Sequence, residues 1–402
     1  MLHMLSCHAL NVARLLVPLI LLMVLSINLP LALPAHASPD RFTTNTFDSP
    51  LLAPDGVAAT FKIHLPLVRM TTTAALDQPK VYWGALVEAR CPTTDDMKPG
   101  GLFDTFEKRA QKKMSIIHWG QPWKMDGKYL KFQTEYFTNV RNHGAIPLLD
   151  WGSWHLGDGT NQPDYQLRDI YEGKHDAYIK QWALDAKAWN HPFFLRFNWE
   201  MNGNWQFPWS EQLNSNQPGD FIKAWRHVHD IFTQNGTRNV TWVWCPNISG
   251  LTTRSMASLY PGDNYVDWTC LDGYNKDSTW INFNTVFTGY GITWIKNSYE
   301  EILKVAPNKP LMIGEFASNE AGDGGAKKAA WIRDAFLTQL PTKFPKIKAV
   351  VWFNWDDRNS AITFPIESSA ASISAFAAGV KPAYYAANNY ANLNQSPIPA
   401  LP

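Results

Sequence analysis

Short apolar runs alternate along the chain with longer segments of mixed polarity. The runs begin at Val81, Met114, Ala145, Phe193, Val240, Val266, Pro310 and Ile347. Most of them are apolar almost throughout, rather than at every second position. Such runs are typical of parallel strands that are buried on both faces. The pattern therefore predicts a parallel sheet of eight strands.

The segments between the runs have the periodicity of amphipathic helices. In residues 220–232, Phe221, Trp225 and Val228 fall on one helical face. Residues 326–340 repeat the pattern through Ile332, Phe336 and Leu340. Each strand is thus expected to be followed by a helix that covers the sheet.

Eight strand and helix units of about 35 to 40 residues predict an α/β fold, a closed (β/α)8 TIM barrel over residues 80–385. The alternative is an open doubly wound sheet, which would favour a G-x-G-x-x-G phosphate loop after its first strand. The chain has no such loop there. Residues 38–79, rich in Ser, Thr, Pro and Asp, are interpreted as a linker or N-terminal arm, and 386–402 as a C-terminal tail.

Residues 1–37 have the pattern of a secretory signal peptide. Arg14 is their one charged residue, an apolar stretch follows to Leu33, and Ala35-His36-Ala37 resembles a cleavage site. An uncleaved anchor helix is the alternative, because the stretch nears the ~18 residues that a span needs. Its prolines and the Ala-x-Ala ending favour cleavage, so we expect a secreted protein, extracellular or periplasmic.

Charge and cysteine content limit the classes of partner. The chain has 36 basic and 35 acidic residues, and loss of Arg14 with the signal leaves 35 of each. A formally neutral protein is not expected to bind nucleic acid or, after cleavage, a membrane. Cys91, Cys245 and Cys270 remain after cleavage, and a Cys245–Cys270 disulfide is one possibility in an oxidising compartment.

Tryptophan is abundant, with 19 residues in 402. Flat aromatic rings suit a neutral polyhydroxylated ligand, because its C–H faces stack on them. We therefore expect a polysaccharide as the ligand, bound by a monomer. The histidines show no H-x-x-x-H spacing, and we predict neither a metal nor another cofactor.

Two glutamates end apolar runs at matching positions, Glu200 in LRFNWE and Glu315 in LMIGEF. Active sites of such barrels lie at the carboxyl ends of the strands, so both side chains are expected at one mouth. Hydrolysis of a glycosidic bond uses two carboxyl groups, one to protonate the leaving oxygen and one to attack the anomeric carbon. A separation of about 5 to 5.5 Å gives retention, and roughly 6.5 to 9.5 Å gives inversion.

These residues belong to a pattern that resembles glycoside hydrolase family 26, which includes endo-acting β-mannanases. The resemblance rests on RFNWEMNGNWQFPW at 196–209, LDGYN at 271–275, MIGEFAS at 312–318 and VVWFN at 350–354. It extends over about residues 80–380 and implies a retaining barrel enzyme. Glu200 would be the general acid/base and Glu315 the nucleophile.

The resemblance implies further roles near the scissile bond. Tyr274 would hydrogen-bond the nucleophile, Trp205 would line a sugar subsite, and Trp352 would be the platform under the cleaved sugar. The family usually has a histidine before the acid/base, where this chain has Trp199. We expect Trp199 to pack elsewhere and Asn198 to contact the sugar instead.

Other polar and aromatic residues at strand ends are weaker candidates for binding substrate. Arg196 shares a strand face with Glu200 and is expected either to hold the glutamates or to form a structural ion pair, with Asp272 as a possible partner. The remaining candidates are His118, Trp119, Trp123 and Trp151, together with Asp150 and Trp154. Each either lines the cleft or belongs to the core.

The sequence thus predicts an endo-β-glycanase, with β-1,4-mannan as the first substrate. Glu200 is expected to have a raised pKa as the acid, and Glu315 to be kept ionised by Tyr274 and Arg196. Mixed-linkage β-glucan and β-1,3-xylan are alternative substrates within the same resemblance. A non-catalytic carbohydrate-binding barrel is the alternative from another class.

Overall fold

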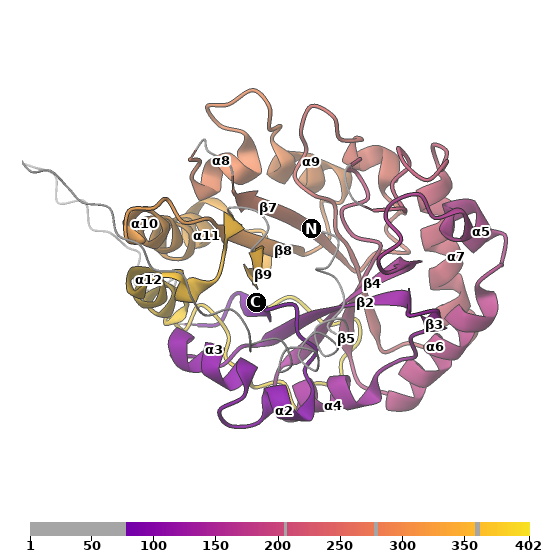
Figure 1. The fold of residues 1–402 in the computed structure, drawn as a ribbon, viewed down its shortest axis with the longest axis horizontal. Helices are drawn as coiled ribbons and strands as arrows, with labels where there is room; N and C mark the ends of the chain where they lie inside the picture. Colours follow the sequence, from indigo (N-terminus) through magenta and orange to yellow (C-terminus); the bar gives the residue numbers. More distant parts are fainter. Residues whose placement is uncertain (1–77, 205–206, 277–279, 358–361) are drawn as a thin grey trace, which may run out of the picture.

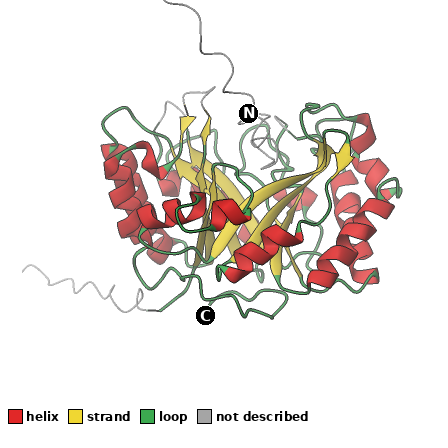
Figure 2. Ribbon diagram, turned by 60° about the horizontal axis from the view of Figure 1, so that its bottom comes forward, coloured by secondary structure: helices red, strands yellow, loops and turns green. Residues whose placement is uncertain are grey.

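The structure is a computed structural model, and it describes residues 78–204, 207–276, 280–357 and 362–402. Eight parallel strands form a ring in the order β1-β9-β8-β7-β6-β5-β4-β2, which closes through pairing of β1 with β2. Helices surround the strands (Figures 1 and 2). The predicted closed (β/α)8 barrel is confirmed. The predicted signal peptide and nearly all of the N-terminal arm lie outside the described residues.

All eight predicted runs form barrel strands. They are β1 (Tyr82–Val87), β2 (Ile116–Met125), β4 (Ile146–His155), β5 (Phe193–Phe197), β6 (Val240–Trp244), β7 (Trp268–Asn275), β8 (Leu311–Ser318) and β9 (Ile347–Asn354). Among the described residues, three short strands lie outside the ring. They are β3 (Lys128–Tyr129), which pairs antiparallel with β2, and the pair β10 (Asp356–Asp357) and β11 (Ile362–Thr363).

Helices follow most of the strands. The longer ones are α3 (Leu102–Ala110), α4 (Thr134–Asn142), α6 (Asp176–Trp189), α7 (Asp220–Gln234), α9 (Ser298–Val305), α10 (Ala326–Asp334) and α12 (Ala370–Val380). The shorter ones are α2 (Thr94–Met97), α5 (Leu167–Tyr171), α8 (Phe283–Thr288) and α11 (Leu340–Lys343), with a π-helical segment, Ala335–Gln339, between α10 and α11.

Alternation along each strand sorts its side chains between the barrel interior and the helix layer. On β5, Phe197 packs against Trp225 of α7, whereas the neighbouring Arg196 contacts Asp150 and Asp272 from other strands. Neighbouring strand residues point to opposite faces, so the interior of the barrel receives the charged side chains. On β5 the outer face receives Phe197.

The C-terminal residues pack across the N-terminal end of the barrel. The backbone N–H of Ile398 donates to Thr241 Oγ1 at 2.9 Å, and Trp268 Nε1 donates to the Ile398 carbonyl at 2.8 Å. Tyr82 OH donates to the Pro399 carbonyl at 3.1 Å. The segment predicted as a tail therefore closes the end of the barrel opposite the strands' carboxyl termini.

A disulfide joins Cys245, which directly follows β6, to Cys270 on β7. The pairing that the sequence left open is thus present, and it links two neighbouring strands close to the carboxyl end of the barrel. None of the helices in the described ranges combines the length and the apolar character needed to cross a membrane.

Candidate active site

Glu200 is turned into the mouth of the barrel by an unusual backbone at the end of β5. Asn198 has φ of 48° and Glu200 has φ of 51°, in the left-handed region that residues other than glycine rarely adopt. The Glu200 N–H donates to the Cys245 carbonyl at 2.7 Å, which ties this turn to the neighbouring strand. Backbone of this kind clusters at functional sites, where the surrounding structure holds it.

The Glu200 carboxyl group accepts a hydrogen bond from the amide of Asn247. Asn247 is itself fixed by Asn202, which accepts from its backbone N–H at 2.9 Å and donates to its carbonyl at 2.8 Å. The glutamate side chain is almost buried, with 5% of its surface exposed. The amide carries no full charge, and its hydrogen bond lowers the pKa of Glu200 less than burial raises it.

Glu315 has stronger partners. Arg196 Nη1 lies 3.0 Å from Glu315 Oε1, and the hydroxyl of Tyr274 donates to Glu315 Oε2. Glu315 keeps 4% of its surface exposed, while Arg196 is completely buried. A cation and a hydroxyl donor both favour a carboxylate over a carboxylic acid. The predicted contact between Tyr274 and the second glutamate is therefore present in the structure.

Arg196 is the centre of a buried cluster of charges. Its Nη1 lies 3.2 Å from Asp150 Oδ1, and its Nη2 contacts Asp272. His118 Nε2 lies 3.0 Å from Asp150 Oδ2. Arg196 therefore has both of the roles considered for it. The same guanidinium forms ion pairs with interior aspartates and holds Glu315.

Gly314 makes room for this cluster beside Glu315. A Cβ atom at this position would lie 2.4 Å from Cys270 Sγ, 2.9 Å from Asp272 Oδ1 and 3.1 Å from Arg196 Cζ. The strand register also shifts between Ile313 and Phe316 where β8 pairs with β9. The small residue lets β8 run against the disulfide and the guanidinium while it presents Glu315.

The two glutamates differ in the interactions that set their pKa values. Burial, reinforced by the negative charge of Glu315, raises the pKa of Glu200 to about 7, as the sequence predicted for the acid. Burial also raises the pKa of Glu315, against the lowering effects of Arg196 and Tyr274. Tyr274 and Arg196 both lower this pKa, as expected, but burial is the larger effect, so the net shift is upward.

The neighbours of Glu315 keep their own protons. Burial disfavours the charged form of Arg196, but Asp150, Asp272 and Glu315 outweigh this effect and raise the pKa of its guanidinium. Burial and then the nearby Glu315 raise the pKa of Tyr274 well above its usual range. Both groups therefore remain donors toward Glu315, which makes Glu315 the better placed carboxyl group to carry negative charge.

His118, Asp150 and Glu315 offer ligand atoms within 4.8 Å of one another, a grouping that could hold a metal ion. The guanidinium of Arg196 already lies against both Asp150 and Glu315. A cation placed between them would meet this positive charge at close range. The positive charge available to the carboxylates in this cluster is that of arginine.

Several predicted binding residues lie in the core instead. Trp119 packs on Phe137 of α4, Trp151 stacks on Trp182 of α6, and Trp123 packs against Trp151. All three are completely buried. They occupy the outer face of their strands, toward the helices, so the prediction that they bind sugar is wrong. The neighbouring His118, Asp150 and Asp272 do point inward, but they too are buried within the charge cluster.

Trp352 is also a core residue. It is fully buried and packs against Phe316, Trp331 of α10 and Phe376 of α12, with its Nε1 donating to the Phe364 carbonyl at 3.3 Å. A side chain enclosed in this way presents no face to a ligand, so the predicted platform is wrong. Alternation along β9 directs this residue toward the helices.

The predictions for the segment around Glu200 had mixed outcomes. Trp199 packs on Phe207 and Trp209, away from the mouth, as expected. Asn198 is fully buried, and its side chain accepts from the Ser153 N–H at 2.8 Å and donates to Ser153 Oγ at 2.9 Å. It therefore fixes the β4 end rather than contacting sugar. Trp205 lies outside the described residues.

Sequence reasoning missed residues that follow the strand ends rather than end them. Asn247 lies two residues after Cys245, and half-buried Trp355 directly follows β9, near Phe353, which contacts Tyr274. An available signal was that an asparagine or tryptophan came within three residues of the end of a strand. Trp355 is the aromatic residue of this segment that retains an exposed surface.

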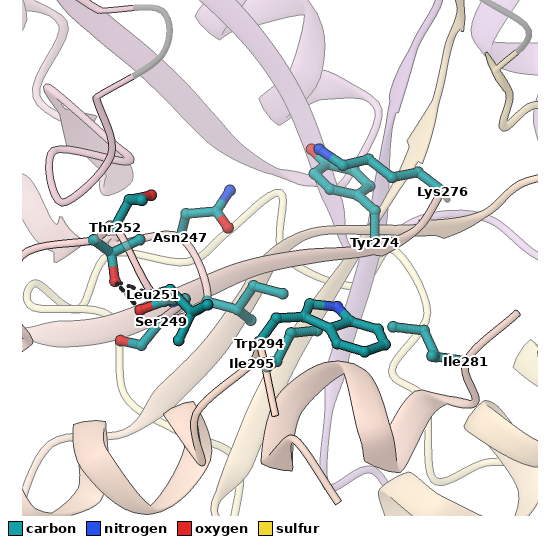
Figure 3. A pocket seen from close by; sticks show the side chains of 12 residues that line it. Asn247, Ser249, Leu251, Thr252, Tyr274, Lys276, Ile281, Trp294 and Ile295 are labelled. Carbon is teal, nitrogen blue, oxygen red and sulfur yellow. Dashed lines mark hydrogen bonds between the residues drawn. The ribbon is translucent and has the colours of Figure 1, made fainter. Parts of the chain in front are cut away.

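An open pocket of about 260 Å³ lies against hydrogen-bond partners of both glutamates. Its lining includes Asn247, which bonds Glu200, and Tyr274, which bonds Glu315. Figure 3 shows these two side chains together with Lys276 and Trp294, which come from later segments. The pocket thus reaches one hydrogen-bond partner of each glutamate.

Comparison with known proteins agrees with this geometry. The profile of Glycosyl hydrolase family 26 matches residues 121–321, half of the chain. Endoglucanase H of Acetivibrio thermocellus is 35% identical over 285 residues, 68% of this chain and 28% of that protein. Mannan endo-1,4-beta-mannosidase A and B of Caldalkalibacillus mannanilyticus is 27% identical over 164 residues, 40% of this chain and 27% of that protein.

A solved endo-beta-1,4-mannanase of Cellulomonas fimi superposes with a TM-score of 0.57 at 16% identity, covering 77% of this chain and 72% of that one. This likeness concerns the fold. The chain spans less than a third of the length of the two curated relatives named above. The barrel and its paired glutamates, taken with the match to half of the sequence, define the class: the chain belongs to glycosyl hydrolase family 26.

Proposed function

We propose that this protein is a retaining endo-β-glycanase. The observation that carries the proposal is that two nearly buried carboxyl groups at the barrel mouth have different hydrogen-bond and charge partners. Glu200 has an amide partner and a pKa raised to about 7, whereas Glu315 contacts a guanidinium and a tyrosine hydroxyl. Environments that differ in this way separate an acid from a nucleophile.

In the first step Glu315 attacks the anomeric carbon while Glu200 gives its proton to the leaving oxygen. The glycosidic C–O bond breaks, and a glycosyl ester forms on Glu315. Esterification removes the negative charge of Glu315, which lowers the pKa of Glu200 because that charge had raised it.

In the second step Glu200, now ionised, takes a proton from water as the water oxygen attacks the same anomeric carbon. The ester bond breaks, Glu315 leaves as a carboxylate, and the sugar is released with its original configuration. Arg196 and Tyr274 stabilise the negative charge that returns to the Glu315 carboxylate. The two steps restore both glutamates to their starting forms.

β-1,4-Mannan is the substrate predicted from the sequence, and a relative of this chain is a mannan endo-1,4-beta-mannosidase. β-Glucan is a second candidate, favoured by one observation: the match to Endoglucanase H is both more identical and longer, at 35% over 68% of this chain. A reducing-sugar assay with mannan, barley β-glucan, xylan and cellulose separates these substrates.

The same assay tests the catalytic assignment. Glu200→Gln and Glu315→Gln should each lower hydrolysis of the preferred glycan by orders of magnitude while oligosaccharide binding survives. Unchanged turnover in either variant would reject the assignment. A wild-type chain that binds a glycan and cleaves none would instead favour the carbohydrate-binding barrel.

We also propose that the protein is exported as a monomer. The leader-like composition of residues 1–37 supports export, as does the Cys245–Cys270 disulfide, since disulfides persist in oxidising compartments. Amino-terminal sequencing of the protein recovered from culture medium tests the cleavage after Ala37. Light scattering of the same sample tests the monomer.

A further inference from the structure

The pocket beside the glutamates continues away from the catalytic centre. Its outer wall consists of the segment 249–253, which follows β6, and of Trp294, which lies between α8 and α9. In Figure 3 the Trp294 indole lies between Ile281 and Leu251, with Tyr274 and Lys276 across from it. The pocket is thus bounded by a flat ring on one side and polar groups on another.

Trp294 is unusual among the tryptophans of this chain. Most of them in the described residues are buried, whereas Trp294 exposes 43% of its surface and the neighbouring Leu251 exposes 72%. Exposing large apolar side chains together in a pocket is unfavourable unless a ligand covers them. A sugar ring fits this surface, because its C–H face stacks on an indole and its hydroxyls reach polar groups.

The place of the pocket relative to the two glutamates indicates which part of a glycan it binds. Asn247 lines the pocket and donates to Glu200, the proposed acid. The acid has to reach the oxygen that joins the cleaved sugar to the leaving sugar, so the leaving sugar lies on its side. Most of the lining residues belong to 247–253, which continue from Asn247, so we place the pocket on the leaving-group side of the scissile bond.

We propose that this pocket is a subsite for the leaving-group portion of the β-glycan, with Trp294 as its stacking surface and Lys276 as a hydrogen-bond donor. The proposal rests on the proposed glycanase function and extends it. Lys276 lines the pocket and is exposed, with its Nζ 6.0 Å from the centre of the Tyr274 ring, so its ammonium group is available to the hydroxyls of a bound sugar. The pocket volume of about 260 Å³ suits a short portion of a glycan rather than a long chain.

The test compares two substrates of the glycan that the wild-type protein cleaves. One is a long oligosaccharide, which fills subsites on both sides of the scissile bond. The other is an activated aryl glycoside of the same sugar, whose small leaving group does not reach the pocket. Trp294→Ala should lower kcat/KM for the oligosaccharide about five- to tenfold and leave that for the aryl glycoside unchanged. Trp294→Phe should recover most of the loss.

Tyr290→Ala is the matched control, because Tyr290 is 77% exposed on the same connection but does not line the pocket. It should change neither rate. Equal kinetics of wild type and Trp294→Ala on the oligosaccharide would overturn the subsite, as would an equal loss on both substrates. A wild-type protein that cleaves no β-glycan would overturn the proposed function, and the subsite with it.

Discussion

The guanidinium of Arg196 lies 3.0 Å from the carboxylate of Glu315, although Arg196 comes from β5 and Glu315 from β8, on different sides of the barrel. The same guanidinium contacts Asp150 and Asp272. Because all four groups are buried, the charge of the proposed nucleophile is part of the charge balance of the barrel interior. Stability and catalysis are therefore coupled at this residue.

Arg196→Met should destabilise the fold by about 3 to 5 kcal/mol, because it leaves three buried carboxyl groups without their cation. Burial already raises the pKa values of Asp272 and Glu315, and loss of the cation removes an effect that lowers them. The variant should therefore regain stability as the pH falls and the groups become protonated. Urea unfolding at several pH values measures this. Arg168→Met, which breaks an exposed ion pair, should cost less than about 1 kcal/mol.

The rate should fall as the pH rises above about 7, because Glu200 has to hold a proton in the first step and its pKa is raised to about 7. The positive charge of Lys276 lowers this pKa, so Lys276→Met should move the alkaline limb of the kcat/KM profile to higher pH. Lys327→Met, an exposed change on α10, should leave the limb in place. A limb that moves to lower pH in Lys276→Met would contradict the assignment of Glu200 as the acid.

Gly314→Ala should lower both stability and activity. The added Cβ would lie 2.4 Å from Cys270 Sγ, so β8 or the disulfide has to shift, at a cost of about 1 to 3 kcal/mol. Glu315 is the next residue and moves with the strand. Thermal unfolding and the rate on the preferred glycan measure the two effects. A variant with unchanged stability and rate would show that the strand does not need this close approach.

Trp352→Ala and Trp355→Ala should separate core packing from substrate contact. Trp352 is enclosed by aromatic residues of α10 and α12, so its loss should cost about 3 to 5 kcal/mol. Half-buried Trp355 should contribute less to stability and more to kcat/KM. If Trp352→Ala folds normally and loses only activity, Trp352 contacts the substrate and the assignment to the core is contradicted.

The fold was predictable because all eight strands are buried on both faces, so each of them is a nearly continuous apolar run in the sequence. The glutamates were predictable for a related reason, since a charge that ends such a run lies at the mouth of the barrel. The aromatic residues were not, because Trp151 and Trp352 lie next to inward positions but face the helices. A shift of one residue along a strand turns a side chain from the barrel interior to the helix layer. Which of the two faces an aromatic residue takes depends on the backbone at the strand end.

Residues that act from loops were equally hidden. Asn247 reaches Glu200 only because Asn202 pairs with its backbone, a contact between two turns 45 residues apart. Trp294 lies between helices, where an exposed aromatic has no periodicity to mark it. The net pKa of Glu315 depends on how far burial outweighs its partners, which spacing along the chain does not reveal.

Rescue by azide tests the division of labour between Glu200 and Glu315 most directly. With an activated aryl glycoside, Glu200→Ala should form the glycosyl ester and release it to azide as the β-glycosyl azide, whereas Glu315→Ala should give the α-glycosyl azide by direct displacement. Nuclear magnetic resonance of the anomeric proton distinguishes the products. The account predicts opposite anomers from the two variants, and the same anomer from both, or rescue of neither, would contradict it.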